Sequence, residues 1–253
     1  MMRLRVLGSS GAEFPDFHPP AFLVDDHLLL DAGTICSVLS EEEQLGIQDI
    51  FITHSHLDHI RGIPALADNI ITKNAARTVT VYGTSDIIAA VRGHLFNNVI
   101  WPDFSQIPTP ENPVLTFKEL EAGRDNTVAS WTIKAVEVNH TVPAVGYIIN
   151  KNGKTLAYTG DTGSTEEIWR YLSGIDALIV EVSFPDSMES RALLTRHLTC
   201  SLLRAELDKI DRLPCRIFIT HPKPQYYDTI KSEVDRLGIK GIELLHDGAV
   251  YGI

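Results

Sequence analysis

The sequence predicts an α/β protein in which two β-sheets pack face to face and helices cover their outer surfaces. Apolar runs of strand length recur in both halves of the chain, among them 4–7 and 50–53 in the first and 155–159 and 216–220 in the second. Stretches with helical patterning accompany them in each half. Because an apolar sheet face must be buried against another layer, two β-rich halves with flanking helices favour a stack of two sheets between helices.

The composition is that of an ordinary globular protein. The chain has 253 residues, of which 44% are hydrophobic and 22% are charged, so it carries ample material for a core. No internal repeat, low-complexity segment or linker divides the sequence. We therefore expect a single domain over residues 1–253.

The first half is predicted to consist of strands with a few helices between them. The strands are expected at 4–7, 21–24, 28–31, 50–53 and 79–82. A helical pattern follows residues 54–59, and another runs from Ser85, which is expected to be its cap, to about His94. The stretch 96–113 is rich in proline and is expected to form an ordered surface loop of irregular structure.

The second half is also predicted to consist of strands with helices between them. Its strands are expected at 131–138, 146–150, 155–159, 177–181, 216–220 and 241–245. Asn152 and Gly153 predict a hairpin turn between the second and third of these strands. Helices are expected at 165–172, 198–210 and about 227–237.

Charge and cysteine content limit the classes of partner. A formal net charge of −11 disfavours stable binding of nucleic acid, which depends on Lys and Arg at the phosphates, but a small anionic substrate still fits a locally positive metal pocket. The three cysteines (Cys36, Cys200 and Cys215) show no CxxC spacing, which predicts reduced thiols. The amino terminus lacks the pattern of a signal peptide, and no apolar run approaches the roughly 20 residues that span a bilayer. We expect a cytoplasmic protein without a membrane partner.

The most informative stretch directly follows the apolar run 50–53. It carries the three imidazoles of His54, His56 and His59 and the carboxylate of Asp58. Imidazole nitrogen and carboxylate oxygen are the ligands of catalytic zinc, manganese or iron, whereas structural zinc is usually bound by thiolates. An α/β protein also tends to place its chemistry at strand ends. The stretch therefore predicts a catalytic metal site.

Further ligands are expected directly beyond other strands. His140, Asp161 and His221 each follow a predicted strand at such a position. Together with the first cluster they give seven ligands, enough for two metal ions a few ångströms apart. A carboxylate with two oxygens suits the group that bridges two ions, and Asp161 is the candidate for this role.

The order of these residues resembles the metallo-beta-lactamase superfamily. The resemblance rests on His54-Ser-His-Leu-Asp-His59, His140, Gly160-Asp161-Thr162 and His221, with Leu30-Asp31-Ala-Gly33 similar to the strand and turn ahead of the metal motif. It implies a four-layer αββα sandwich with a dinuclear site at the shared edge of the sheets. It also implies one metal on His54, His56 and His140, a second on Asp58, His59 and His221, and Asp161 with a hydroxide as bridges.

Within this superfamily, the chain is most similar to class II 3',5'-cyclic-nucleotide phosphodiesterases. The segments that carry this similarity are 56–64, 97–104, 143–147, 181–185 and 196–199. Cys200 and Asp186 depart from the pattern, which has proline and asparagine there. The implied reaction is hydrolysis of a cyclic nucleotide, with cyclic AMP converted to 5'-AMP by a metal-bridged hydroxide.

Two alternatives from the same superfamily stay open. One is a tRNA 3'-end endoribonuclease of the tRNase Z type, although the basic, glycine-rich arm usual in those enzymes is absent from this sequence. The other is a thioester or lactone hydrolase, for which His197 would be dispensable. For either phosphodiester reaction, Asp58, Asp161 and His197 form the expected catalytic set, with His197 donating a proton to the leaving oxygen.

Other residues are candidates for supporting roles. Trp101 and Phe104 are candidates for stacking on a purine, with pinning of the loop to the body as the alternative. Thr162 and Ser183 are candidates for phosphate contacts, and Asp31 and Glu181 for orienting a ligand histidine. The cofactors are expected to be two divalent ions, zinc first, with manganese or iron as alternatives. A homodimer is expected from the resemblance alone.

Overall fold

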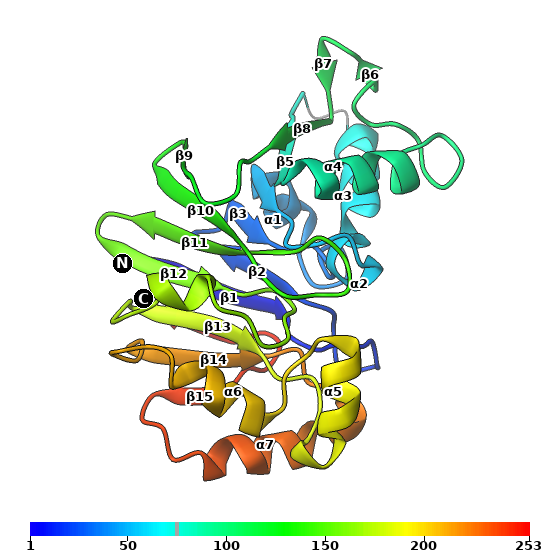
Figure 1. Cartoon of the computed structure of the whole chain (residues 1–253). Coiled ribbons are helices and arrows are strands. Elements are labelled where there is room, and N and C mark those ends of the chain that lie inside the picture. Colours follow the sequence, from blue (N-terminus) through cyan, green and yellow to red (C-terminus); the bar gives the residue numbers. More distant parts are fainter. Residues whose placement is uncertain (74–75) are drawn as a thin grey trace.

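Two seven-stranded sheets lie face to face in the computed structural model of this chain, as the sequence predicts (Figure 1). The structure describes residues 1–73 and 76–253. The first sheet has the order β16 (Val250–Gly252), β1 (Arg3–Gly8), β2 (Ala21–Val24), β3 (Leu28–Leu30), β4 (Asp49–Phe51), β5 (Val79–Gly83) and β8 (Leu115–Glu119). The second has the order β9 (Asp125–Val128), β10 (Trp131–Glu137), β11 (Val145–Lys151), β12 (Lys154–Tyr158), β13 (Ala177–Glu181), β14 (Arg216–Thr220) and β15 (Ile242–Leu244).

The two sheets share one pairing pattern. In the first sheet β16, β1, β2 and β3 pair antiparallel, and β3, β4, β5 and β8 pair parallel. In the second sheet β9 to β12 pair antiparallel, and β12 to β15 pair parallel. Strands β3 and β12 therefore occupy equivalent positions, and so do β4 and β13. Because parallel strands end at the same edge of a sheet, residues beyond β4 and β13 can meet where the sheets adjoin.

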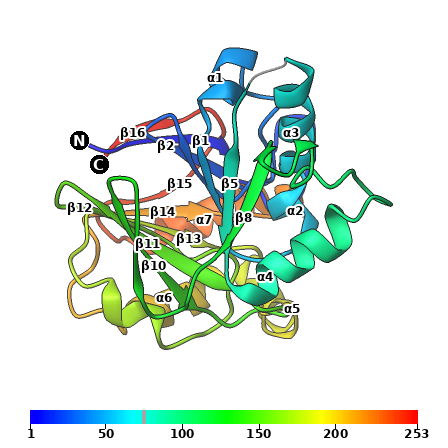
Figure 2. The same cartoon turned by 90° about the horizontal axis from the view of Figure 1, so that it is seen from above.

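Helices cover the outer faces of both sheets (Figure 2). On the side of the first sheet lie α1 (Glu41–Gly46), α2 (Leu57–Ile60), α3 (Gly62–Thr72) and α4 (Ser85–Ala90), which continues as a π-helical turn, Val91–Leu95. On the side of the second sheet lie α5 (Glu189–Thr195), α6 (Cys200–Leu207) and α7 (Tyr227–Arg236). Short 3₁₀ turns cover Ile168–Tyr171, Asp186–Met188 and Pro224–Tyr226. The order helix, sheet, sheet, helix is the predicted four-layer sandwich.

The apolar residues form two buried clusters. The larger one fills the space between the sheets, where Phe51 and Tyr147 meet edge to face, and extends under α3 through Leu66. The smaller one lies between the second sheet and its helices, where Leu203 of α6 and Ile230 of α7 pack against that sheet. Burial on both faces explains why β4 and β13 read as continuous apolar runs.

Some predicted elements differ from the structure. The helix expected at 165–172 is only the 3₁₀ turn Ile168–Tyr171, because Thr165 N–H and Trp169 Nε1–H both donate to the buried carboxylate of Glu206 and draw the segment toward α6. Helix α4 begins at Ser85, but Thr84 is the residue at its cap position. The polar strand β9 and the short elements β8, β16, α1 and α5 were not expected.

The stretch 96–113 is the irregular excursion that its proline content predicts. It projects from one end of the molecule with α4 and carries the two-residue strands β6 (Pro108–Thr109) and β7 (Asn112–Pro113) (Figure 1). Phe104 is 3% exposed and belongs to the larger core cluster. Its ring therefore anchors the loop to the body.

Within residues 1–73 and 76–253, no helix combines the length and the apolar character that a bilayer crossing requires. The expected cytoplasmic location stays a prediction.

Candidate metal centre

The histidine-rich segment leaves the first sheet at the end of β4 and is held against the second sheet. His54 forms an isolated antiparallel bridge with Ala144, and Val145 N–H donates to the carbonyl of Thr53. Helix α2 then begins at Leu57, and Ala32 N–H donates to the carbonyl of His59. These backbone bonds fix the directions of the His54, His56 and His59 side chains.

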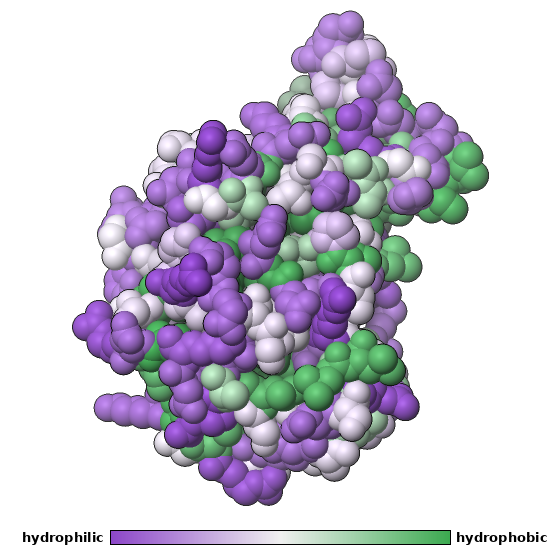
Figure 3. Space-filling view, in the orientation of Figure 1, coloured by the Kyte–Doolittle hydropathy of each residue, from purple (hydrophilic) through white to green (hydrophobic). Residues whose placement is uncertain are grey.

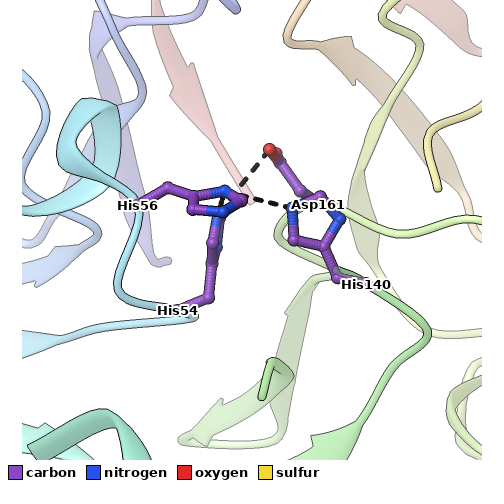
Figure 4. Close-up of side chains that lie close together, drawn as sticks. All are labelled: His54, His56, His140 and Asp161. Carbon is purple, nitrogen blue, oxygen red and sulfur yellow. Dashed lines mark hydrogen bonds and ion pairs between the residues drawn. The ribbon is translucent and has the colours of Figure 1, made fainter. Parts of the chain in front are cut away.

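Three imidazoles and one carboxylate converge in a first donor set (Figure 4). His56 Nδ1 lies 3.0 Å from His54 Nε2 and 3.2 Å from His140 Nε2. Asp161 Oδ2 lies 3.8 Å from His54 Nε2. The four side chains come from the end of β4, the turn before β11 and the turn after β12, so both sheets contribute.

A second donor set lies beside the first. It consists of Asp58, His59 and His221. Asp58 Oδ2 is 3.9 Å from His59 Nε2 and 3.6 Å from His221 Nε2. Asp161 Oδ2 is 3.4 Å from His59 Nε2 and 3.2 Å from His221 Nε2. Asp161 therefore adjoins both sets, which is the position that a bridging carboxylate requires.

The chemistry of these donors fits divalent metal ions. His59 Nε2, His221 Nε2 and Asp161 Oδ1 are buried and find no hydrogen-bond partner among the described residues. Unpaired buried polar atoms are costly, and three of them among these donors call for a ligand that accepts lone pairs. Burial raises the pKa of the Asp161 carboxyl, but the imidazoles of His221 and His59 lower it well below its usual range. The donors suit two ions, and imidazole with carboxylate does not separate zinc from manganese or iron.

A buried carboxylate directly after β3 orients one of these ligands. Asp31 Oδ2 accepts hydrogen bonds from His59 Nδ1 at 2.7 Å, Tyr158 Oη at 2.8 Å and Thr53 Oγ1 at 2.8 Å. Asp31 Oδ1 accepts from Thr53 N–H at 2.8 Å. This leaves His59 Nε2 free to face the donor cluster, as expected for Asp31 from the sequence.

His140 is held by the residue before His197. The Arg196 carbonyl accepts from His140 Nδ1 at 3.1 Å, and the Arg196 guanidinium donates back to the His140 carbonyl. Arg196 has a φ of 54°, a left-handed conformation that is uncommon outside glycine. Arg196 is the C-cap residue of α5, a position where helices commonly end in this conformation. No pattern in the sequence marked Arg196 for such a role.

His197 adjoins the donor cluster and rests on Glu181. One ring nitrogen of His197 lies within 4.8 Å of ligand atoms of Asp161 and His221. His197 Nδ1 donates to Glu181 Oε1 at 2.6 Å. Burial lowers the pKa of His197, but the Glu181 carboxylate more than offsets this and raises it overall. Glu181 was expected to orient a ligand histidine, and its direct partner is His197.

Comparison with known proteins decides the family. A family model for the beta-lactamase superfamily domain matches residues 29–219. The chain belongs to the metallo-beta-lactamase superfamily. The matched range holds six of the seven predicted ligands, and His221 follows two residues beyond it. The resemblance stated from the motif order is confirmed.

Relatives of this metallo-beta-lactamase superfamily member include cyclic-nucleotide phosphodiesterases and ribonucleases Z. A probable 3',5'-cyclic-nucleotide phosphodiesterase of Yersinia pestis is 27% identical over 237 residues, covering 79% of this chain and 65% of the relative. A ribonuclease Z of Methanococcus maripaludis is 24% identical over 302 residues, covering 94% of this chain and 93% of that protein. The crystal structure of unliganded yeast PDE1 has a TM-score of 0.85 at 20% identity and covers 98% of both chains. The predicted fold and the similarity to cyclic-nucleotide phosphodiesterases are confirmed.

Three of the residues expected to contact substrate are buried in this superfamily member. Thr162 and Ser183 are fully buried, and their hydroxyls donate to the Gly163 carbonyl at 2.7 Å and to Glu181 Oε2 at 2.7 Å. Both hydroxyl protons are thus engaged inside the protein, and a phosphate contact of either residue stays a prediction. Phe104 is buried in the core and has no free face for a base. Trp101 is 37% exposed, and its role in stacking stays a prediction.

Two residues of the histidine-rich segment also line an apolar groove. This groove of about 230 Å³ is lined by Ser55, Leu57, Ile60, Ile100 and their neighbours. Leu57 is 63% exposed and Ile100 is 62% exposed. In Figure 3, green also gathers over α5, where Leu193 and Leu194 are exposed. The segment that carries four of the donors thus also contributes to an apolar groove.

Proposed function

We propose that this chain hydrolyses 3',5'-cyclic nucleotides, with cyclic AMP converted to 5'-AMP as the expected reaction. The observation that carries the proposal is the position of His197, a proton-bearing group held at a two-metal donor cluster by Glu181. The coarser statement, a hydrolase of the metallo-beta-lactamase superfamily with a His/Asp cluster, does not depend on the substrate. The name of the Yersinia pestis relative supports the finer one.

Seven residues would hold the two metal ions that phosphodiester hydrolysis requires. Bound metal ions supply a Lewis acid for the phosphoryl oxygens and a water of lowered pKa. His54, His56 and His140 would hold one ion, Asp58, His59 and His221 the other, and Asp161 would contact both. Burial of Asp161 and His59 excludes bulk water from this side of the site, which strengthens electrostatic interactions there.

His197 supplies the step that a ribose leaving group needs. The departing 3'-oxygen is a poor leaving group unless it receives a proton. Since Nδ1 of His197 is engaged by Glu181, Nε2 is the atom left to hold a proton toward the reacting phosphate. A thioester or lactone substrate would not require this group.

Ribonuclease Z activity is the second candidate, because the Methanococcus maripaludis relative matches 94% of this chain. The net charge of −11 disfavours it, since binding of RNA depends on neutralising phosphates.

The expected homodimer stays a prediction.

Turnover assays on one metal-analysed preparation distinguish these functions. The substrates are 3',5'-cyclic AMP, 2',3'-cyclic AMP, bis(p-nitrophenyl) phosphate and a tRNA precursor, with His59→Ala as the control for the metal site. Release of 5'-AMP that is lost in His59→Ala supports the proposal. Cleavage of only the generic diester or the tRNA precursor rejects the cyclic-nucleotide substrate. If two metal ions are bound and none of the four substrates is turned over, phosphodiester hydrolysis is rejected, and thioesters and lactones are the next substrates to assay.

A further inference from the structure

Two buried hydroxyls connect carboxylates to metal-ligand histidines in the same way in both sheets. Thr53 is the second residue beyond β4, and Ser183 is the second residue beyond β13, the equivalent strand of the other sheet. Both residues are fully buried. Thr53 Oγ1 donates to Asp31 Oδ2 at 2.8 Å and lies 3.0 Å from His54 Nδ1. Ser183 Oγ donates to Glu181 Oε2 at 2.7 Å and lies 2.8 Å from His221 Nδ1.

The direction of the protons in these chains follows from counting donors. Glu181 Oε1 accepts from Thr162 N–H at 2.9 Å and from His197 Nδ1, and Oε2 accepts from Leu198 N–H at 3.4 Å, so both oxygens act as acceptors. A hydroxyl has one proton, and Ser183 gives it to Glu181. The Ser183 oxygen is then an acceptor toward His221, which must carry its proton on Nδ1. In the first sheet, Thr53 likewise gives its hydroxyl proton to Asp31. Its oxygen is then an acceptor toward His54, which must carry its proton on Nδ1.

This proton position matters because of the atoms that face the cluster. His54 and His221 both direct Nε2 at the other donors. A neutral imidazole has one protonated and one unprotonated nitrogen, and only the unprotonated one binds a metal. Fixing the proton on Nδ1 therefore leaves the lone pair on Nε2, where a metal ion would bind.

We propose that Thr53 and Ser183 are positioning residues that fix the Nδ1-protonated form of His54 and His221, one ligand of each metal ion. Each buried carboxylate thereby serves two histidines, one directly and one through a hydroxyl. Asp31 holds His59 directly and His54 through Thr53, and Glu181 holds His197 directly and His221 through Ser183. The inference rests on the metal centre of the proposed function and not on its substrate.

The test compares Thr53→Val, which keeps the shape of the side chain, with Thr53→Ser, which keeps the hydroxyl. Ser183→Ala removes the second hydroxyl. Thr34→Val is the matched control, because the Thr34 hydroxyl is buried and has no partner among the described residues. Nitrogen-15 NMR of the imidazoles in the metal-free proteins reports which nitrogen carries the proton, and chelator competition reports the affinity for each zinc ion.

We expect His54 in Thr53→Val and His221 in Ser183→Ala to lose the pure Nδ1-protonated form. Each of these variants should bind one of its two zinc ions about 10–100-fold more weakly, as for the loss of other contacts behind metal ligands. Thr53→Ser and Thr34→Val should behave like the parent. Unchanged protonation and affinity in Thr53→Val and Ser183→Ala would overturn the proposal, and so would an equal loss in Thr53→Ser. Since neither readout uses substrate, failure to hydrolyse cyclic nucleotides leaves this test intact.

Discussion

At the scale of single residues, the site depends on whether each polar side chain beyond a strand points toward the donor cluster or away from it. Asp161 directs Oδ2 toward three ligand nitrogens, while Thr162, the next residue, turns its hydroxyl back to the Gly163 carbonyl. Two neighbouring residues therefore have opposite orientations: the Asp161 carboxylate faces the donor cluster, and the Thr162 hydroxyl bonds to the backbone.

This difference limits what the sequence predicts about the site. Histidines and aspartates directly beyond apolar strands predicted the donors that the structure brings together, because strand ends meet at one edge. The orientation of Thr162 and Ser183 was not predictable, since a hydroxyl in a turn is equally suited to phosphate and to a buried carboxylate. For Phe104 the sequence left stacking and pinning of the loop open, and its burial agrees with pinning, which depends on how the proline-rich loop folds back.

Replacing His197 tests its role as a proton donor. His197→Ala should lower turnover of a cyclic nucleotide by about 10²–10⁴, the usual contribution of a general acid. Metal content should stay at the parent value, because His197 stands outside the two predicted metal-ligand sets. Steady-state kinetics and elemental analysis check this, with the exposed His246→Ala as control. Parent-like turnover in His197→Ala would remove this residue from the mechanism.

At the scale of elements, strand predictions succeeded where a run is buried on both faces, as in β4 and β13. Strand β9, with the sequence Asp-Asn-Thr-Val, lies at a sheet edge and has no apolar face to reveal it. The turn at Ile168–Tyr171 shows tertiary contacts overriding helical patterning, because Glu206 holds Trp169. The sequence therefore predicted elements whose residues are buried on both faces. It did not predict elements whose conformation depends on polar contacts with residues far away in the chain.

The turn between β12 and Asp161 depends on Gly160. Its φ is +61°, and a Cβ there would lie 2.7 Å from the Cβ of Thr53. Gly160→Ala should therefore lower the free energy of unfolding by about 1–3 kcal/mol and displace Asp161. Urea unfolding measures the loss.

Gly93→Ala is the matched control for this substitution. A Cβ at Gly93 meets nothing within 4 Å, so alanine should raise stability slightly, by about 0.5–1 kcal/mol. Equal stability changes in Gly93→Ala and Gly160→Ala would show that the close approach at Thr53 has no energetic weight.

At the scale of the whole molecule, the donors connect the two sheets. Segment 54–59 belongs to the first sheet, and His140, Asp161 and His221 belong to the second. Removal of metal with a chelator should therefore lower the melting temperature, and restoring it at 100 times its Kd should add about 2.7 kcal/mol of stability. Calorimetry on the parent and on His59→Ala checks this, and a chelator effect of the same size in both would contradict it.

Stability should also fall in acid. Burial raises the pKa of Asp25, but hydrogen bonds from Arg3 N–H and Lys151 lower it overall from its ordinary 3.8, and Lys154 and Thr155 N–H lower that of Asp176. A carboxyl with a lowered folded-state pKa stabilises the fold above its unfolded pKa and loses this contribution as the pH falls. The free energy of unfolding should therefore decline below about pH 4. Urea titrations between pH 5 and 3 should show a shallower decline in the double variant Asp25→Asn/Asp176→Asn, and an unchanged slope would refute the assignment.

The division of the donors between the sheets has a consequence for biosynthesis. The segment 54–59 leaves the ribosome long before β14 and His221, because translation runs from the amino terminus. A nascent chain that ends before residue 140 would present four ligand side chains without their partners at 140, 161 and 221. Loading of both ions must follow synthesis of β14, so in a cell the availability of metal matters after translation of this strand rather than during the first half of the chain.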